Sequence, residues 1–390
     1  MIFTFYCMNI LNLIRLLSNK GKVRVLFVYF DQSFCNFDIN ANIVLQYLVD
    51  TKQYDISIYD PYRHCTVNSN DISIYNSWNR KFQKNILQKT KFVFCSFFQD
   101  IERVISSSYF IANKQYIINI WHGMPVRNIV ACDTIEKNLA KNILEYRRKD
   151  RIHHVVISKF YQEVFMRSWK CYQEQVHVLG NIRASIILDR SERVLQYLRR
   201  IKSDFENYKV LLFCPTHSTR VMVDGSELQL FIYDDYDKLL LSKFLSENNI
   251  LLLVKTHDGD CNIYDCDAEN IIKLDNKQLQ SLNITTQSLF QYTNALITDI
   301  SSIYVDYLLT KKPIICTDVP SDYKRSRSFV LDSIVLDNIS STQKELCHSI
   351  MYAITNGVTS EQEDVHNVVY DTELDNTLVL SRIEQVLKSL

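Results

Sequence analysis

The chemistry-bearing residues with the most informative spacing follow a short apolar run, residues 117–120, which predicts a buried parallel strand. The segment Trp121-His122-Gly123-Met124-Pro125 comes directly after this run, and Arg127 lies two residues beyond the proline. A histidine at the carboxyl end of a strand lies at the sheet edge where ligands bind, and imidazole is suited to proton transfer near neutral pH. Gly123 permits close approach of a substrate to the backbone, and Arg127 supplies a cation for phosphate. A structural histidine in a βα loop is the alternative interpretation.

Three further polar clusters follow apolar runs in the second half of the chain. They are Pro215-Thr216-His217-Ser218, Lys255-Thr256-His257-Asp258 and Thr298-Asp299-Ile300-Ser301-Ser302. A parallel sheet brings the carboxyl ends of its strands together, so we expect the three clusters to meet at one edge. Ser301 and Ser302 are predicted to begin a helix, where unpaired N–H groups and the helix dipole favour an anion. Lys255 and His257 add donors for that anion.

Asp306 is predicted on the same helix face, four residues after Ser302. We expect its carboxylate to accept hydrogen bonds from ribose hydroxyls beside the phosphates, with Pro215 and Thr216 shaping the nucleotide pocket. The structural alternatives are that Asp299 or Ser301 caps the helix, a contribution of about 1 kcal/mol, and that Asp306 is a solvated surface charge.

The elements that must position these residues alternate between short apolar strands and helical patterns, as βαβ units do. In the first half we expect strands at residues 23–29, 56–59, 92–95, 116–120, 155–157 and 176–179, with helices at 41–49, 79–88 and 134–146. In the second half we expect strands at 210–214, 250–255, 295–298 and 313–316. This alternation predicts an α/β protein with parallel sheets.

A chain of 390 residues is too long for one ordinary core, so we expect two Rossmann-like domains facing a cleft. The predicted domains cover residues 1–190 and 208–390, joined by a connecting helix at 191–207. The tail from residue 344 is helical in pattern and is expected to pack on the outside or to cross back to the first domain. The active site is expected where the carboxyl ends of both sheets meet.

Composition excludes several classes of protein. Apolar residues make up 47% and charged residues 23%, which is typical of a folded globular protein. The 44 basic and 44 acidic residues cancel, which argues against a nucleic-acid partner. The 11 cysteines form no CxxC pair and indicate a reducing compartment, and no GxGxxG motif indicates a nicotinamide or flavin cofactor. No apolar stretch reaches membrane-spanning length, no signal peptide is expected, and residues 1–22 are predicted to pack on the protein surface, with a membrane-surface helix as the alternative.

These motifs resemble those of the CDP-glycerol:poly(glycerophosphate) glycerophosphotransferases, a family of teichoic acid and capsule enzymes of the cell envelope. The resemblance covers about residues 23–323 and rests on five motifs in order, at residues 121–127, 180–185, 214–216, 255–258 and 298–307. This chain departs from the family pattern at Met124, where a hydroxyl is usual, and at Asp258, where a proline is usual. In the second motif only Gly180 and Arg183 remain.

The resemblance implies a GT-B fold and a metal-independent transferase without a cofactor. It implies transfer of glycerol phosphate from CDP-glycerol to a hydroxyl of a polymer or lipid-linked glycan acceptor, with release of CMP; CDP-ribitol or another CDP-activated polyol fits equally well. In this scheme the first domain is the acceptor side and the second binds the donor. The implied location is cytoplasmic, as a peripheral protein on the inner face of the cell membrane.

The resemblance implies His122 as the general base and His257 as a second essential histidine. The expected donor and phosphate site comprises Gly123, Met124, Arg127, Arg183, Pro215, Thr216, Lys255, Ser301, Ser302 and Asp306. Two alternatives stay open: a GT-B glycosyltransferase that uses a nucleotide sugar, and a non-catalytic relative that binds polymer or nucleotide. Outside the site, His153 and His154 are predicted to be helix-terminal or interface residues, and His217 is a further candidate for a donor contact.

Overall fold

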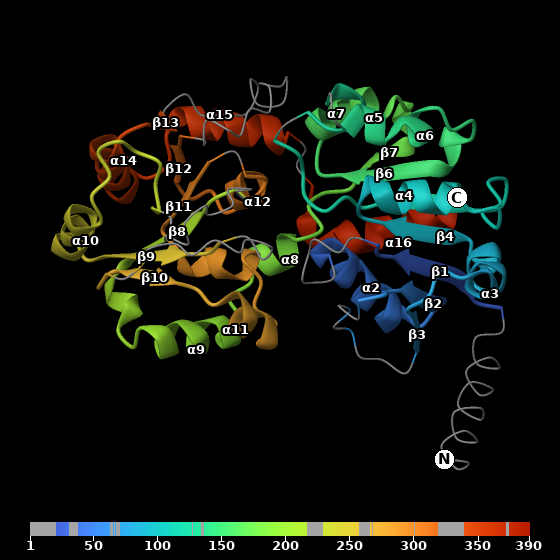
Figure 1. Ribbon diagram of the computed structural model, residues 1–390, viewed down its shortest axis with the longest axis horizontal. Helices are drawn as coiled ribbons and strands as arrows, with labels where there is room; N and C mark the ends of the chain where they lie inside the picture. Colours follow the sequence, from blue (N-terminus) through green and yellow to red (C-terminus); the bar gives the residue numbers. More distant parts are fainter. Residues whose placement is uncertain are drawn as a thin grey trace, which may run out of the picture.

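The computed structural model describes residues 21–30, 38–62, 65, 67, 71–126, 128–133, 136–216, 229–256, 266, 268–299, 301–318, 339–371 and 374–390. These residues form two α/β domains that lie side by side (Figure 1), each built on a parallel sheet with helices on its faces. The predicted α/β class with two Rossmann-like domains is confirmed.

The first sheet contains seven parallel strands in the order β3-β2-β1-β4-β5-β6-β7. Their bounds are β1 Val23–Val28, β2 Tyr54–Tyr59, β3 Ile72–Tyr75, β4 Phe92–Cys95, β5 Tyr116–Asn119, β6 Ile152–Val156 and β7 Val176–Val178. The strand order reverses between β1 and β4, so their carboxyl ends flank a switch point, where doubly wound sheets bind ligands. The sequence did not predict β3, because this edge strand is partly exposed and lacks the continuous apolar run of a central strand.

Helices cover both faces of the first sheet. They are α2 Ile39–Thr51, α3 Arg80–Asn85, α4 Phe98–Ile105, α5 Glu136–Leu139, α6 Lys141–Leu144 and α7 Lys159–Trp169. The helix predicted at 134–146 is therefore two short helices, α5 and α6. The central strands are buried on both faces, as shown by Phe27 and Phe94, whose rings stack 4.7 Å apart within the core.

The second sheet contains six parallel strands in the order β10-β9-β8-β11-β12-β13. Their bounds are β8 Lys209–Cys214, β9 Ile250–Val254, β10 Ile271–Lys273, β11 Ala295–Thr298, β12 Ile314–Thr317 and β13 Ile339–Ser340. The order again reverses between two strands, β8 and β11, which places a second switch point there. The edge strands β10 and β13 were not predicted, because each is too short to give a periodic signal.

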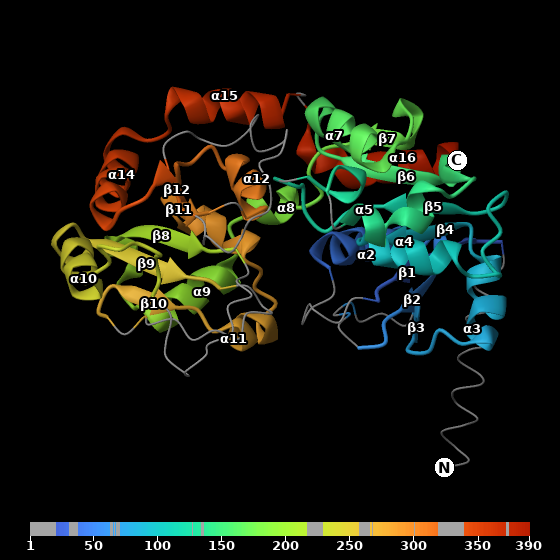
Figure 2. The same ribbon diagram turned by 45° about the horizontal axis from the view of Figure 1, so that its top comes forward.

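The helices of the second domain begin directly after β7, where the chain passes from the first domain to the second. Its helices are α8 Ala184–Ile187, α9 Glu192–Ile201, α10 Lys238–Glu247, α11 Asn276–Ser281, α12 Ile303–Leu308, α14 Gln343–Asn356 and α15 Ser360–Val369. Helix α9 was expected as a connecting helix, but it lies beside β9 and β10 in both ribbon views (Figures 1 and 2). The Tyr292 hydroxyl donates to the Ser191 carbonyl at its start, 2.7 Å away. The segment 191–207 is therefore packed into the second domain.

The last helix, α16 Val379–Ser389, returns to the first domain. Its apolar side chains Val379, Ile383 and Leu387 are buried in the same core cluster as Phe27 and Ile118 of the first sheet. The tail thus crosses back, one of the two expected arrangements, and the range 208–390 contains a helix whose core contacts lie with the first domain.

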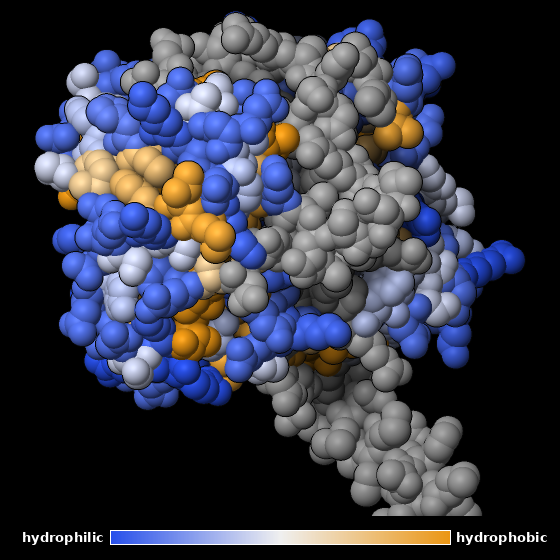
Figure 3. Space-filling view, turned by 60° about the vertical axis from the view of Figure 1, so that its left-hand side comes forward, coloured by the Kyte–Doolittle hydropathy of each residue, from blue (hydrophilic) through white to orange (hydrophobic). Residues whose placement is uncertain are grey.

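On the side of the second domain, the described surface is mainly hydrophilic and carries several hydrophobic patches (Figure 3). Exposed apolar side chains of this domain include Leu239 and Leu240 at the start of α10, and scattered residues of this kind are common on protein surfaces. Of the helices in the described ranges, none is long and apolar enough to span a bilayer.

Candidate active site

His122 lies in a turn at the carboxyl end of β5, called here the His122 turn (residues 121–124). Its ring Nδ1 is 3.2 Å from the carbonyl oxygen of Ser96, which follows β4. The ring also stacks on Phe97 with centroids 4.3 Å apart. A carbonyl oxygen only accepts hydrogen bonds, so Nδ1 carries the proton and the lone pair of the neutral ring lies on Nε2. This tautomer is the one that accepts a proton at Nε2.

The first residue of the turn, Trp121, has a left-handed backbone with φ of 43°. Such a conformation costs about 1–3 kcal/mol and persists only where the surroundings hold it. The Trp121 ring packs edge-on against Trp169, 5.6 Å away, and the backbone N–H of Trp121 donates to Asn119 Oδ1 at 3.1 Å. Asn40 donates to the carbonyls of Ile120 and Trp121 at 3.1 and 2.5 Å. The strained backbone of Trp121 and the side chains that hold it therefore fix the orientation of His122.

Asp38 anchors Ser96, the residue that orients the His122 ring. Its Oδ1 accepts from the Ala41 N–H at the start of α2 and from the Ser96 hydroxyl, both at 3.0 Å. Burial raises the pKa of Asp38, and the charge of Arg183 partly opposes that rise. Asp38 and Asn40 were missed from the sequence. The signal available was Asp38 immediately before an apolar helical pattern, which is typical of a helix cap.

In the second domain, β9, β8 and β11 are neighbours, so the described residues of the three polar clusters follow adjacent strands at one edge of the sheet, as predicted. At the switch point, the Asp299 carboxylate accepts from the Thr216 N–H at 3.0 and 2.9 Å and from the Thr216 hydroxyl. Burial raises the pKa of Asp299, while the bonds from Thr216 and from the Ser301 N–H oppose the rise. Asp299 therefore ties the ends of β8 and β11 to the start of α12.

Lys255 lies at the end of β9, where its side chain is buried and its Nζ donates to the Thr256 carbonyl at 2.8 Å. Burial raises the pKa of the Cys214 thiol, at the end of β8, to about 12, and the positive charge of Lys255 partly opposes that rise. Pro215, the next residue along, is half-buried. The cation predicted at this edge of the second sheet is thus in place.

The two domains approach each other at Gly123 and Ser302. A Cβ placed on Gly123 would stand 3.4 Å from the Ser302 hydroxyl and 3.6 Å from Arg183 Nη1. Ser302 is exposed and begins α12, and its side chain makes no capping hydrogen bond. The His122 turn of the first domain therefore faces the helix start of the second domain, where the sequence placed an anion.

Arg183 and Asp306 are placed differently from the expectation. Arg183 is buried, and its Nη1 donates to Asp306 Oδ2 at 2.7 Å. Its Nε donates to Asn40 at 2.8 Å, and its Nη2 donates to the His122 carbonyl. Burial lowers the pKa of this guanidinium, but Asp306 and Asp38 outweigh burial and the net shift is upward. The expected contact of Arg183 with phosphate is replaced by contacts within the protein.

Asp306 is buried as well, so it is not a solvated surface charge. Besides Arg183, its carboxylate accepts from Asn181 at 3.3 Å and from Gln287 at 3.0 Å. These three donors occupy the carboxylate from inside the protein. The structure therefore shows contacts within the protein in place of the expected contact with ribose hydroxyls. The spacing of residues along a helix could not reveal this, because it does not show which groups surround a side chain after folding.

The remaining predicted residues are placed as follows. Met124, the last residue of the His122 turn, is buried in the core. Arg127, His257 and His217 lie outside the described residues. In the part of the chain that the structure describes, no group of three or more His, Cys, Asp or Glu is arranged to hold a metal. Metal independence stays a prediction.

His153 and His154 were predicted to be helix-terminal or interface residues, and this was wrong. Both lie within β6 and are buried. His153 Nδ1 is 2.9 Å from His177 Nε2 on β7, and His154 Nδ1 is 2.9 Å from Asn119 Nδ2 on β5. Their polar rings broke the apolar pattern, so the strand was predicted to start three residues too late.

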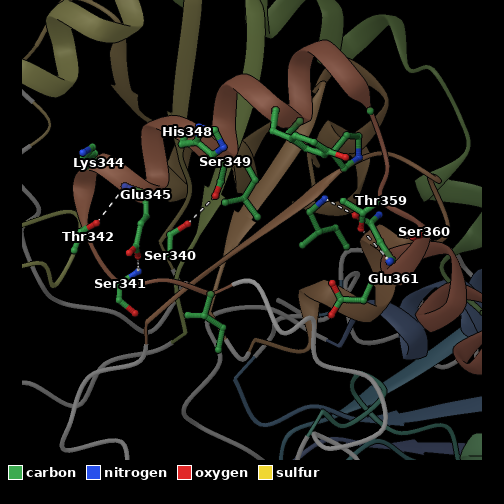
Figure 4. A pocket seen from close by; sticks show the side chains of 18 residues that line it. Ser340, Ser341, Thr342, Lys344, Glu345, His348, Ser349, Thr359, Ser360 and Glu361 are labelled. Carbon is green, nitrogen blue, oxygen red and sulfur yellow. Dashed lines mark hydrogen bonds between the residues drawn. The ribbon is translucent and has the colours of Figure 1, made fainter.

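A separate hollow of about 1070 Å³ lies between α14, α15 and the strands β12 and β13 (Figure 4). Several of its polar groups hydrogen-bond to each other. Ser340 and Ser349 hydroxyls are 3.0 Å apart, and Glu345 accepts from the Ser341 N–H at 2.8 Å. None of the predicted site residues lines this hollow, so it is separate from the site described above.

Comparisons with known proteins place the chain in a family. The model of the family described as CDP-Glycerol:Poly(glycerophosphate) glycerophosphotransferase matches residues 12–372. The teichoic acid ribitol-phosphate polymerase TarK of Staphylococcus aureus is 24% identical over 343 residues, which is 84% of this chain and 61% of TarK. A teichoic acid poly(glycerol phosphate) polymerase of Staphylococcus epidermidis is 22% identical over 209 residues, 51% of this chain and 28% of that protein.

This chain thus spans about three fifths of the length of TarK. It spans less than a third of the length of the Staphylococcus epidermidis polymerase. Among solved structures, the wall teichoic acid polymerase TagF superposes with a TM-score of 0.68 at 16% identity, covering 99% of this chain and 95% of TagF. That likeness confirms the predicted GT-B arrangement of the two domains. The match of the family model over most of the sequence shows that the chain belongs to the CDP-glycerol:poly(glycerophosphate) glycerophosphotransferase family.

Proposed function

We propose that this chain transfers a polyol phosphate from a CDP-activated polyol to a hydroxyl of a cell-surface polymer or lipid-linked acceptor, with release of CMP. Membership of the family supports the reaction type. The relatives named above are a ribitol-phosphate and a glycerol-phosphate polymerase, which supports CDP-ribitol or CDP-glycerol as the donor. A TagF structure obtained after a soak with CDPG supports a CDP-polyol site in this fold.

One observation carries the proposal: the His122 turn and the start of α12 come from different domains and adjoin at Gly123 and Ser302. A base on one wall and an anion-binding helix start on the other are what transfer of a phosphate group to a hydroxyl requires. The bond between Nδ1 and the Ser96 carbonyl supports the role of His122, because it leaves Nε2 as the basic nitrogen.

In the proposed reaction, His122 Nε2 takes the proton from the acceptor hydroxyl. The acceptor oxygen forms a bond to the distal phosphorus of the CDP-polyol. The bond between that phosphorus and the bridging oxygen breaks, and CMP leaves with the bridging oxygen and the electron pair. The proton on His122 then passes to solvent, which restores the neutral base. A general base of this kind contributes a factor of roughly 100 to 10,000.

The charge of the diphosphate is assigned to Lys255, His257, Ser301 and Ser302. Lys255 supports this role because its cationic side chain lies at the carboxyl edge of the second sheet, beside the switch point. Donors held rigidly before the reaction stabilise developing charge without reorganising, which is the main contribution expected in phosphoryl transfer. The buried Arg183 acts through the protein and not on the donor.

The test is CMP release from CDP-glycerol and from CDP-ribitol with a lipid-linked polyol-phosphate primer. His122→Gln should lower CMP release about 100- to 10,000-fold, the range for loss of a general base. His348→Gln is the matched control, because His348 is an exposed histidine on α14, in the separate hollow. Near-normal release by His122→Gln would refute the assigned base. Mass spectrometry of the product should show a phosphodiester; a plain glycoside would favour the nucleotide-sugar alternative.

We extend the proposal to a cytoplasmic location with peripheral contact at the inner face of the cell membrane. This extension rests on the lipid-linked acceptor proposed above, since the acceptor end of such a molecule stays at the membrane surface. Co-sedimentation of the protein with anionic vesicles should exceed that with neutral vesicles, and absence of any binding to either would contradict the membrane contact.

A further inference from the structure

Three successive backbone carbonyls at the end of β5 each accept a hydrogen bond from a side chain that is distant in the sequence. Asn40 Nδ2 donates to the carbonyls of Ile120 and Trp121, and Arg183 Nη2 donates to the carbonyl of His122. The two donors are themselves joined, because Arg183 Nε donates to Asn40 Oδ1 at 2.8 Å. The path of the backbone into His122 therefore depends on this pair of side chains.

The same guanidinium also reaches the second domain. Arg183 follows β7, just before the chain crosses between the domains, and its Nη1 donates to Asp306 of α12. Ser302, which adjoins the His122 turn, begins the same short helix. One planar group thus contacts the backbone of the proposed base and the helix that begins at the proposed phosphate site.

We propose that Asn40, Arg183 and Asp306, called here the domain bridge, are positioning residues that hold the His122 turn at a set distance from Ser302. This inference rests on the proposed function for its kinetic consequence and on geometry for the bridge itself. The bridge does not touch the donor. It acts through the backbone of His122 on one side and through α12 on the other.

The shape of the arginine explains why a point charge would not replace it. The guanidinium holds its N–H groups in a rigid planar fork, and here three of its nitrogens serve three different acceptors. A lysine ammonium carries the same charge on a flexible stem but cannot satisfy the three directions together. Arg183→Lys therefore separates positioning from charge. In enzymes, a misplacement of about 1 Å at the reacting groups can lower the rate about 100-fold.

The kinetic arm compares Arg183→Lys, Asp306→Asn and Asn40→Asp with wild-type protein in the CMP-release assay. Each variant should lower kcat about 100-fold and leave the KM for CDP-glycerol nearly unchanged. The double variant Arg183→Lys/Asp306→Asn should be no slower than the slower single variant, because both changes break one unit. The matched control is Arg199→Lys on α9, in an exposed ion pair with Glu206, which should leave both constants unchanged.

The structural arm needs no activity. Protein labelled with 15N-histidine gives ring signals that report the tautomer of each histidine, and the signal lost in His122→Gln identifies His122. The bridge variants should shift this signal and leave the signals of His153, His154 and His177 in place, with the folded fraction checked by circular dichroism. Asn40→Asp and Arg183→Lys keep this arm usable should Asp306→Asn fail to fold.

The outcomes separate the two proposals. A raised KM with an unchanged kcat in Arg183→Lys would make Arg183 a donor-phosphate contact and would overturn the bridge. Unmoved His122 signals in all folded variants, or additive losses in the double variant, would overturn it as well. Absence of CMP release by the wild-type protein would refute the proposed function, while a shifted His122 signal in the bridge variants would still support the bridge.

Discussion

A buried histidine cluster behind the His122 turn makes the first domain sensitive to acid. Asn119 Nδ2 donates to His154 Nδ1 at 2.9 Å, and Asn119 Oδ1 accepts from the Trp121 N–H. An amide nitrogen only donates, so His154 must be unprotonated at Nδ1 in the folded protein. Burial lowers the pKa of His154 to about 3 and, together with the charge of His177, that of His153 to about 4.

Acid lowers the free energy of unfolding because the unfolded chain binds more protons than the folded protein. Below pH 6.5, the ordinary pKa, the unfolded chain protonates both histidines while the folded protein does not. Each histidine therefore costs about 1.4 kcal/mol of stability per pH unit, until the pH reaches its folded pKa. Between pH 6.5 and 4.5 this amounts to about 5 kcal/mol for the pair. Domains are typically stable by about 5–15 kcal/mol, so the loss is a large part of the total.

Urea unfolding followed by tryptophan fluorescence measures this loss. All three tryptophans of the chain lie in the first domain, and the Trp169 ring is 4.7 Å from His154. The urea midpoint of the wild-type protein should be much lower at pH 4.5 than at pH 7.5. His154→Gln keeps an acceptor for Asn119 but cannot take up the proton, so it should lose about 2.5 kcal/mol less over this range. The exposed His348→Gln should behave as wild type, and an equal loss in His154→Gln and wild-type protein would refute the reasoning.

Two further predictions concern stability. Asp306→Asn should lower the free energy of unfolding by about 3 kcal/mol, the lower end for breaking a buried ion pair, because Asp38 still offsets the charge of Arg183; a midpoint in urea equal to that of Arg199→Lys would contradict this. Gly180→Ala should destabilise by about 1–3 kcal/mol, because a Cβ there would stand 2.7 Å from Asn376 Oδ1 and 2.8 Å from Val379. Gly357→Ala, also at positive φ but with nothing within 4 Å, is its control, and equal losses would show that backbone strain alone is responsible.

Much of the fold could be predicted because buried parallel strands are continuous apolar runs. The runs at β1, β4, β5, β8, β9 and β11 carried that signal. The prediction failed where burial and polarity disagree, as in β6, whose His153 and His154 are buried but polar. It also failed at the edges, since β3 is partly exposed and β13 has two residues.

The candidate site could be predicted in part for a related reason. Strand ends meet at one edge of a sheet, so polar clusters after successive apolar runs identify that edge. The clusters at Thr216, Lys255 and Asp299 were found this way, and β9, β8 and β11 are indeed neighbours. Asp38 and Asn40 were missed, because their contacts with the ends of β4 and β5 join segments more than 50 residues apart.

The amino-acid sequence by itself determined most of the central strands, the order of the motifs and the histidine at the end of β5, because local patterns of apolar residues and turns carry that information. Only the tertiary structure decided that Arg183 and Asp306, 123 residues apart, neutralise each other. The role of a charged side chain depends on the groups that surround it after folding and on whether water still reaches it, and neither is a local property of the sequence.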